Sequence, residues 1–190
     1  MKIITLPNQH LREKSKKISI FTDEVRDLSE KMKAATLEWE DSREHEVGVA
    51  LAAVQIDVMQ KIVIIRVDFN DKKNREFQVF INPEIIKYDG EITEDYEGCL
   101  SIKNIYGKVP RYSKVRIKAL DENGNIVKVK AEGFLARIFQ HEIDHTNGTV
   151  FIDHIKSRQD AFYQLDEKGH LEPLDYEKNV KDNVELWPNE

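Results

Sequence analysis

The sequence has little of what secreted, membrane-spanning or nucleic-acid-binding proteins require. Cys99 is the single cysteine among 190 residues, which excludes an internal disulfide and fits a reducing compartment. No apolar run is long enough to cross a bilayer, and Met1–Pro7 lacks the apolar core of a signal peptide. Lys and Arg are scattered and the formal net charge is −6, which argues against a nucleic-acid partner. We therefore expect a cytoplasmic protein that binds neither membranes nor nucleic acids.

The composition is ordinary for a globular protein. With 40% hydrophobic and 34% charged residues, the chain predicts a single domain over residues 1–190. Residues 156–190 form a polar C-terminal extension with an expected turn at Glu167–Gly169. From about Tyr176 the sequence leaves two alternatives open, a tail that follows the surface and partial disorder.

Hydrophobic periodicity indicates an α+β fold. Helices are predicted over 22–40 and 133–147. Alternating segments around Asn123 and Gly124 favour a tight hairpin. Strands are predicted at 61–67, 77–81, 115–120 and 126–131.

Two further segments complete the expected organisation. Asn82–Pro83 is expected to end the second strand, with 84–88 and the residues after Gly90 as candidates to continue the sheet. The first 18 residues are expected to form an irregular arm. Its expected anchors are Leu6, Leu11 and Ile18.

The segment Phe139–His145 carries the clearest chemical signal. His141 and His145 are four residues apart, so their imidazoles lie one turn apart on one helix face and can hold one metal ion. Glu142 projects about 100° further round the helix, where a carboxylate can accept a proton from a metal-bound water.

The rest of this helix favours a buried site over a surface helix that happens to contain these residues. Apolar side chains make a broad arc that includes Glu142 and has the two histidines at its edge. Burial of these polar groups is costly unless a cation satisfies them. The side chains predicted on the opposite face are Arg137, Gln140 and Asp144.

Three choices exist for a third ligand. Glu167 lies downstream, as in thermolysin-like proteases, but falls in an acidic turn whose expected role is solvation. Phe151 occupies the position of the third histidine in metzincin-type sites, and His154 comes three residues too late. Cys99, preceded by Gly98, is a good soft donor and is the preferred ligand.

Three ordered motifs resemble those of the peptide deformylases. The family patterns Gly-x-Gly-Leu-Ala-Ala-x-Gln, Glu-Gly-Cys-Leu-Ser and Gln-His-Glu-x-Asp-His correspond to Gly48–Gln55, Glu97–Ser101 and Gln140–His145. The similarity extends from about Leu6 to Ile155. It implies removal of the formyl group from the N-terminal formyl-methionine of new polypeptides. It also implies a mixed, mainly antiparallel sheet wrapped around a central metal-site helix.

The resemblance also assigns roles at the metal. Cys99, His141 and His145 would hold one divalent ion, naturally iron(II) in most members, with a water in the fourth position. Zinc, nickel or cobalt would be possible in a purified sample. Glu142 would take the proton of that water and later pass it to the departing amine.

Further roles concern the substrate. The Gln55 amide and the Leu100 backbone N–H would hold the oxygen of the tetrahedral intermediate. The formylated peptide would pair with the chain like an added strand. Its implied binding residues are Gly48, Val49, Ala50 and Gly98. The ribosome is a possible partner, which scattered charge does not predict.

The chain departs from the family pattern at two positions. Ala50 replaces a glycine, and its methyl group could press on the substrate backbone. Lys103 stands where many members have proline, so the expected loop 103–108 could differ in shape. Asp144 has no role in the chemistry, and we expect it to pair with Arg111 and tie a strand to the helix.

Two alternative functions are distinguishable from a deformylase. A zincin-like peptidase would use Glu167 and keep its metal when Cys99 is replaced. A binding module with a structural metal would need a closed site of four ligands, whereas the sequence offers three and a nearby carboxylate.

Overall fold

One antiparallel sheet and two long helices make up most of the fold. The structure, a computed structural model, describes residues 1–20 and 22–187. The strands are ordered β1-β2-β3-β4-β6-β7, with β5 also paired to β4, and every pairing between them is antiparallel. Their bounds are β1 Ala50–Ala52, β2 Ile62–Arg66, β3 Phe77–Cys99, β4 Ile102–Leu120, β5 Ile126–Glu132, β6 Phe162–Leu165 and β7 Leu171–Pro173. The predicted α+β class is confirmed.

Strands β3 and β4 are much longer than the sequence predicted. The predicted stop at Asn82–Pro83 is wrong, because β3 continues through these residues with a shift in register. Asn82 adopts a φ of 50°, and its side chain accepts a hydrogen bond from the Ile18 N–H at 2.8 Å. Proline is tolerated at such an irregularity because the ladder does not need its missing N–H. The predicted loop 103–108 is also wrong, since these residues belong to β4.

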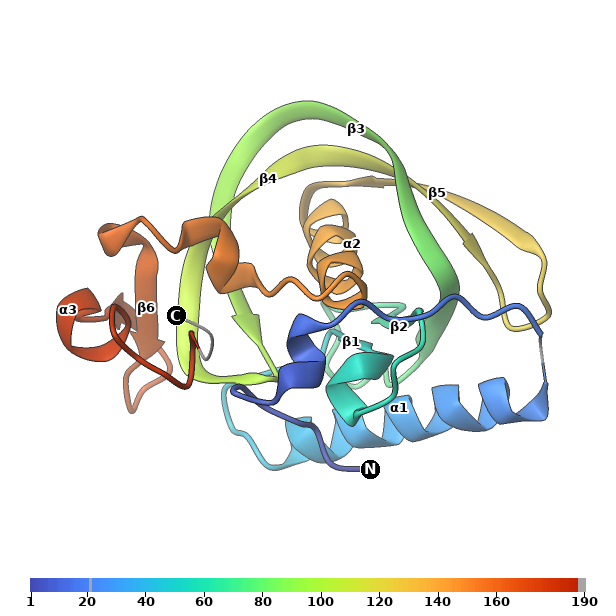
Figure 1. Ribbon diagram of the computed structural model, residues 1–190, viewed down its shortest axis with the longest axis horizontal. Helices are drawn as coiled ribbons and strands as arrows, with labels where there is room; N and C mark the ends of the chain where they lie inside the picture. Colours follow the sequence, from blue (N-terminus) through green and yellow to red (C-terminus); the bar gives the residue numbers. More distant parts are fainter. Residues whose placement is uncertain (21, 188–190) are drawn as a thin grey trace.

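Helix α1 (Asp23–Asp41) confirms the predicted first helix. Its apolar face packs against strands β1 and β2, on the outer side of the sheet in Figure 1. The buried residues on this face include Val25, Leu28, Met32 and Ala35. No helix in the described part of the chain is both long enough and apolar enough to span a membrane.

Helix α2 (Gly133–Thr146) lies inside the arch formed by β3 and β4 (Figure 1). The prediction that Arg137 and Gln140 occupy a face opposite the buried one is wrong, because both residues are at most 5% exposed. Gln140 accepts a hydrogen bond from the Tyr112 N–H at 3.1 Å and donates to the Tyr112 carbonyl at 2.9 Å. The sheet therefore covers α2 on nearly every side.

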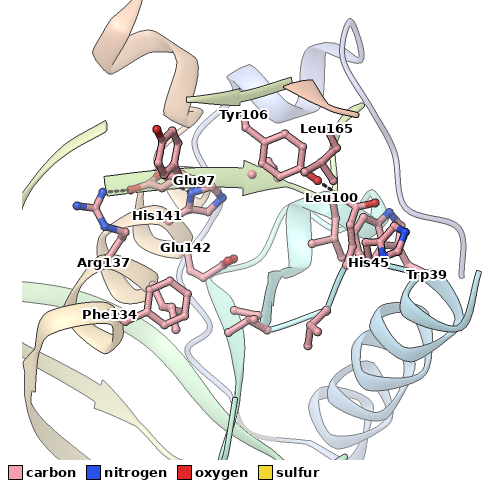
Figure 2. Close-up of a pocket in the computed structure, with 18 of the residues that line it drawn as sticks. Trp39, His45, Glu97, Leu100, Tyr106, Phe134, Arg137, His141, Glu142 and Leu165 are labelled. Atoms are coloured by element: carbon pink, nitrogen blue, oxygen red, sulfur yellow. Dashed lines mark hydrogen bonds and ion pairs between the residues drawn. The ribbon is translucent and has the colours of Figure 1, made fainter. Parts of the chain in front are cut away.

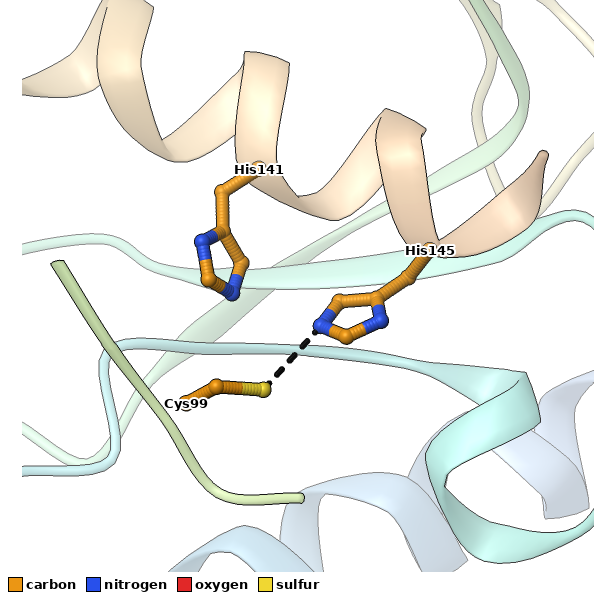
Figure 3. A group of neighbouring side chains, drawn as sticks. All are labelled: Cys99, His141 and His145. Atoms are coloured by element: carbon orange, nitrogen blue, oxygen red, sulfur yellow. Dashed lines mark hydrogen bonds between the residues drawn. The ribbon is translucent and has the colours of Figure 1, made fainter. Parts of the chain in front are cut away.

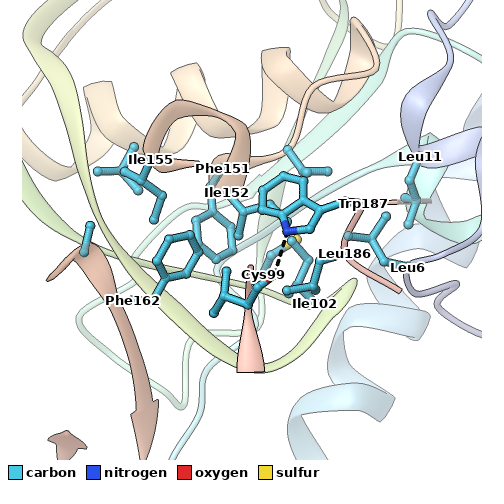
Figure 4. Packing of buried hydrophobic residues seen from close by; sticks show 14 residues of the cluster. Leu6, Leu11, Cys99, Ile102, Phe151, Ile152, Ile155, Phe162, Leu186 and Trp187 are labelled. Atoms are coloured by element: carbon cyan, nitrogen blue, oxygen red, sulfur yellow. Dashed lines mark hydrogen bonds between the residues drawn. The ribbon is translucent and has the colours of Figure 1, made fainter. Parts of the chain in front are cut away.

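The C-terminal part packs onto the fold instead of extending from it. Its short elements are η3 Phe151–Ile155, η4 Gln159–Ala161 and α3 Tyr176–Asn179, beside strands β6 and β7. Trp187 is buried, and its indole N–H donates to the Val180 carbonyl at 2.8 Å (Figure 4). The same apolar cluster contains Leu6 and Leu11, which confirms two anchors of the N-terminal arm. The third expected anchor, Ile18, is also buried.

Candidate metal centre

Three buried side chains from two distant segments form a metal-binding group. Cys99 ends strand β3, whereas His141 and His145 lie one turn apart on helix α2. One donor atom from each residue lies within 4.8 Å of the others, and Cys99 Sγ is 3.2 Å from His145 Nε2 (Figure 3). This juxtaposition is the one expected from the sequence.

The donor set fits a divalent transition metal. A thiolate and two imidazoles suit iron, zinc, nickel or cobalt better than magnesium or calcium. Burial holds the pKa of His145 well below its ordinary value, which keeps this imidazole neutral, as a ligand must be. Within the described residues the group has three protein donors, so a coordination position remains for water. Glu167 and His154 are outside it.

Glu142 lies beside the ligands and has an unsatisfied oxygen. The side chain is buried, and its Oε2 has no hydrogen-bond partner among the described residues. Burial raises the pKa of Glu142 to about 7. A buried carboxylate oxygen without a partner is costly. Its position and pKa suit a group that exchanges a proton with a water in the cavity.

Glu97 orients His141 from behind. Its Oε2 lies 2.9 Å from His141 Nδ1, which leaves Nε2 to face the metal-binding group. Arg111 Nε donates a hydrogen bond to Glu97 at 2.9 Å, and Arg137 Nη1 also donates to Glu97, at 2.8 Å. Burial alone would raise the pKa of Glu97, but hydrogen bonds from His141 and Arg111 lower it below its usual range. The carboxylate therefore stays charged in the interior.

Asp144 makes the contact that the sequence predicted. Arg111 Nη1 donates to its Oδ2 at 2.5 Å, and His154 Nε2 lies 2.7 Å from the same oxygen. This pair connects β4 to helix α2 on the side away from the cavity, as expected.

The Gln55 side chain is fixed at the edge of the metal-binding group. It follows β1 in the short helix η2 Ala53–Ile56, and its Oε1 accepts a hydrogen bond from the Ala52 N–H at 2.9 Å. Its Nε2 then points to Ser101 Oγ at 3.1 Å and Cys99 Sγ at 3.5 Å. The amide N–H groups therefore lie beside Cys99, at the edge of the metal-binding group.

A cavity of about 370 Å³ opens next to the ligands (Figure 2). Predicted site residues on its wall are Val49, Ala50, Gln55, Gly98, Cys99, Leu100, His141 and Glu142. Gly48 is not on this wall, because it packs so closely on Thr36 that an added Cβ would lie 2.5 Å from Thr36 Cγ2. Ala50 belongs to β1, which is an edge strand of the sheet.

Comparisons with known proteins agree with this geometry. A sequence profile of the polypeptide deformylase family matches residues 1–161. The chain belongs to the peptide deformylase family. It is 40% identical over 159 residues to the peptide deformylase of Brachyspira hyodysenteriae, covering 83% of this chain and 81% of that one. It is 39% identical over 169 residues to the peptide deformylase of Thermomicrobium roseum, covering 87% of this chain and 92% of that one.

A solved structure supports the same assignment. The peptide deformylase from Synechococcus elongatus, in complex with actinonin, has a TM-score of 0.74 and 33% identity to this chain. The match covers 82% of this chain and 80% of that one. The family membership confirms the expected metal-dependent hydrolase class.

Sequence reasoning missed several residues of this deformylase site. Arg137 is four residues before His141, a spacing that places both on one side of a helix. Tyr106 also lines the cavity, and its hydroxyl donates to Glu46 in the segment before β1. Other residues of the wall that the sequence did not indicate are Trp39, His45, Phe134, Leu165, Gly169 and Leu171.

Proposed function

We propose that this peptide deformylase removes the formyl group from the N-terminal formyl-methionine of new polypeptides, with Glu142 as general base and then general acid. The observation that carries the proposal is the Glu142 oxygen, which has no hydrogen-bond partner among the described residues and lies on the wall of a cavity that Cys99 and His141 of the metal-binding group also line. A surface helix or a closed structural metal site would not need this carboxylate.

Cys99, His141 and His145 would hold the divalent ion, which we propose is iron(II) in the cell. When bound, such an ion lowers the pKa of a coordinated water to roughly 7, so that hydroxide is available near neutral pH. Cys99 supplies the one thiolate of the site, and Glu97 fixes the orientation of His141.

Glu142 moves the proton. With a pKa of about 7, its carboxylate can accept a proton from the attacking water and return it to the amine that leaves. The amine nitrogen needs this proton because it departs poorly as an anion. One group can therefore serve both steps at neutral pH.

Gln55 and Leu100 stabilise the oxygen of the formyl group as it gains negative charge. In this proposal Gln55 Nε2 and the Leu100 backbone N–H, next to Cys99 in the sequence, would both donate to that oxygen. Each such donor is typically worth ~3–4 kcal/mol in the transition state. The contact between Gln55 Oε1 and the Ala52 N–H keeps the amide in this orientation.

The substrate backbone pairs with the edge strand β1. Val49 and Ala50 offer backbone groups on one side of the cavity and Gly98 on the other, and Gly48 lies just before them in the extended segment that leads into β1. An added Cβ at Gly98 would lie 2.5 Å from the Tyr106 ring, so this side of the groove is tightly packed. The formyl carbon carries only hydrogen, and a narrow site admits it while refusing bulkier acyl groups.

Two comparisons test the proposal. The enzyme loaded with iron or nickel is expected to hydrolyse formyl-Met-Ala and to leave acetyl-Met-Ala intact. Glu142→Gln is expected to retain the metal and to lose at least roughly 100-fold in kcat. Equal rates on the two peptides, or full activity of Glu142→Gln, would refute it.

Two matched variants separate the alternatives. Glu167→Gln is expected to keep both metal and activity, because Glu167 is exposed at the tip of a turn. Cys99→Ala is expected to lose both. The opposite pattern would indicate a zincin-like peptidase.

We also propose that the enzyme acts in the cytoplasm on chains that emerge from the ribosome, since the substrate is a nascent polypeptide. Co-sedimentation of the enzyme with ribosomes translating a formylated chain tests the contact. If the same amount of enzyme sediments with and without ribosomes, the enzyme meets its substrate after the chain has left the ribosome.

A further inference from the structure

The hairpin formed by β6 and β7 closes one end of the substrate cavity. Leu165, Gly169 and Leu171 line the cavity together with Cys99 and His141 of the metal-binding group. They come after residue 161, where the match to the family profile ends. Figure 2 shows Leu165 beside Tyr106, across the cavity from Phe134 and Glu142.

This hairpin is fixed to the core. Strand β6 pairs with β4 through Tyr106↔Tyr163 and Gly107↔Phe162. The Phe162 side chain is buried in the apolar cluster, and its carbonyl accepts a hydrogen bond from the Leu174 N–H at 2.9 Å. The hairpin therefore presents a defined wall to the cavity.

The tip of the hairpin is also packed closely. Gly169 has a φ of +80°, and an added Cβ would lie 2.9 Å from Cγ of His45, which lines the same cavity. Hydrogen bonds from the Gly169 N–H to the Asp166 carbonyl and from the Asp166 N–H to the His170 carbonyl close the turn. The tip is thus held against the segment that precedes β1.

The two faces of the hairpin differ in chemistry. Leu165 pairs with Leu171 and Gln164 with Glu172, so the leucines share one face and the polar pair shares the other. Gln164 Nε2 donates to Glu172 Oε1 at 2.7 Å, away from the cavity lining. Both leucines are half-buried, which leaves apolar surface available to a ligand.

We propose that Leu165 and Leu171 form an apolar subsite for the side chain of the residue that directly follows formyl-methionine. This inference rests on the proposed function. The formyl carbon must lie at Glu142 and the metal-binding group, so the adjacent methionine side chain takes the near end of the cavity, at Phe134 and Ile138 of α2. Successive side chains of an extended peptide point to opposite sides, with a rise of about 3.3 Å per residue, so the side chain after the methionine points across the cavity from Phe134, toward Leu165.

The subsite predicts a preference among formylated tripeptides. Wild-type enzyme is expected to have a higher kcat/KM for formyl-Met-Leu-Leu than for formyl-Met-Gly-Gly. Leu165→Lys is expected to lower this ratio about tenfold, through KM, because a charged group replaces the apolar contact. It is also expected to raise kcat/KM for formyl-Met-Glu-Glu relative to formyl-Met-Lys-Lys.

A control on the same hairpin separates contact from general disturbance. Gln164→Lys places the same charge one residue away, on the opposite face and beside Glu172. It is expected to leave both ratios within about twofold of wild type. Leu171→Ala tests the second leucine without charge, and a thermal unfolding curve of each variant shows whether the fold is kept.

The results of these measurements distinguish failure of the proposed subsite from failure of the proposed function. Unchanged ratios in folded Leu165→Lys and Leu171→Ala would overturn the subsite, as would equal changes in Gln164→Lys. If Leu165→Lys does not fold, the ratio measured with Leu171→Ala decides. Failure of wild-type enzyme to hydrolyse formyl-Met-Gly-Gly would instead overturn the proposed function.

Discussion

Replacement of Glu97 by glutamine tests how the metal centre is held. Glu97 is a buried carboxylate that contacts His141, Arg111 and Arg137 at once. Glutamine keeps the size of the side chain, but it removes the charge and turns one acceptor oxygen into a donor. At least one of the three partners then faces an N–H group in place of an oxygen.

The size of the effect follows from the contacts. Loss of a group that orients a metal-binding histidine typically lowers metal affinity 10–100-fold, or ~1.4–2.7 kcal/mol. Breaking a buried ion pair costs about 3–5 kcal/mol. In Glu97→Gln, Arg111 can still donate to Asp144. Arg137 can still donate to the backbone carbonyls of Val109 and Thr93. We therefore expect a loss near the lower limit, about 3 kcal/mol, in the free energy of unfolding.

Two measurements follow. Competition with a chelator gives the affinity for nickel, and urea unfolding of the metal-free enzyme gives the stability. Glu94→Gln is the matched control, because Glu94 lies on the same strand in an exposed ion pair with Arg158. It is expected to change neither quantity measurably. A folded Glu97→Gln enzyme with nickel affinity within twofold of wild type would refute this view of Glu97.

Three other predictions concern the same fold. Asp144→Asn and Arg111→Ala are each expected to weaken activity, with little further loss in the double variant, because the two side chains act as one pair; additive losses in kcat/KM would contradict this. Trp187→Ala is expected to lower the free energy of unfolding by about 3 kcal/mol, measured in urea, because a buried indole is lost; a change below about 1 kcal/mol would mean that the C-terminal segment contributes little. Removal of the metal is expected to lower the melting temperature, and added nickel at about 100 times its Kd is expected to restore roughly 2.7 kcal/mol; a melting temperature independent of nickel would exclude binding to the native state.

The metal-binding group was predictable because few side chains can serve it. Two histidines at helical spacing need a further donor, and Cys99 is the one cysteine of the chain. The Arg111–Asp144 pair was predictable for a similar reason, since a charged residue on a helix packed against a sheet needs a partner.

The errors came from partners that are distant in the sequence. Arg137 was predicted on a solvated face because a helical projection does not show Glu97, the carboxylate that allows its burial. The strand end at Asn82–Pro83 was wrong because Asn82 bonds to Ile18, 64 residues away. In both cases, the local rule fails because it omits the distant contact that decides the conformation of the segment.

The hairpin lining of the cavity was not predictable for the same reason. The sequence indicates the turn at Glu167–Gly169, which the structure confirms. Two leucines beside a turn do not indicate a binding wall, because such pairs are common in any hairpin. Their position follows from the pairing of β6 with β4, which no local pattern specifies.

The wall of the cavity draws on residues from Trp39 to Leu171, and this has a consequence during translation. The apolar cluster beside Cys99 draws on the chain even later, as far as Trp187. A growing copy therefore completes neither the groove nor the packing beside its ion site until its C-terminal segment has left the ribosome.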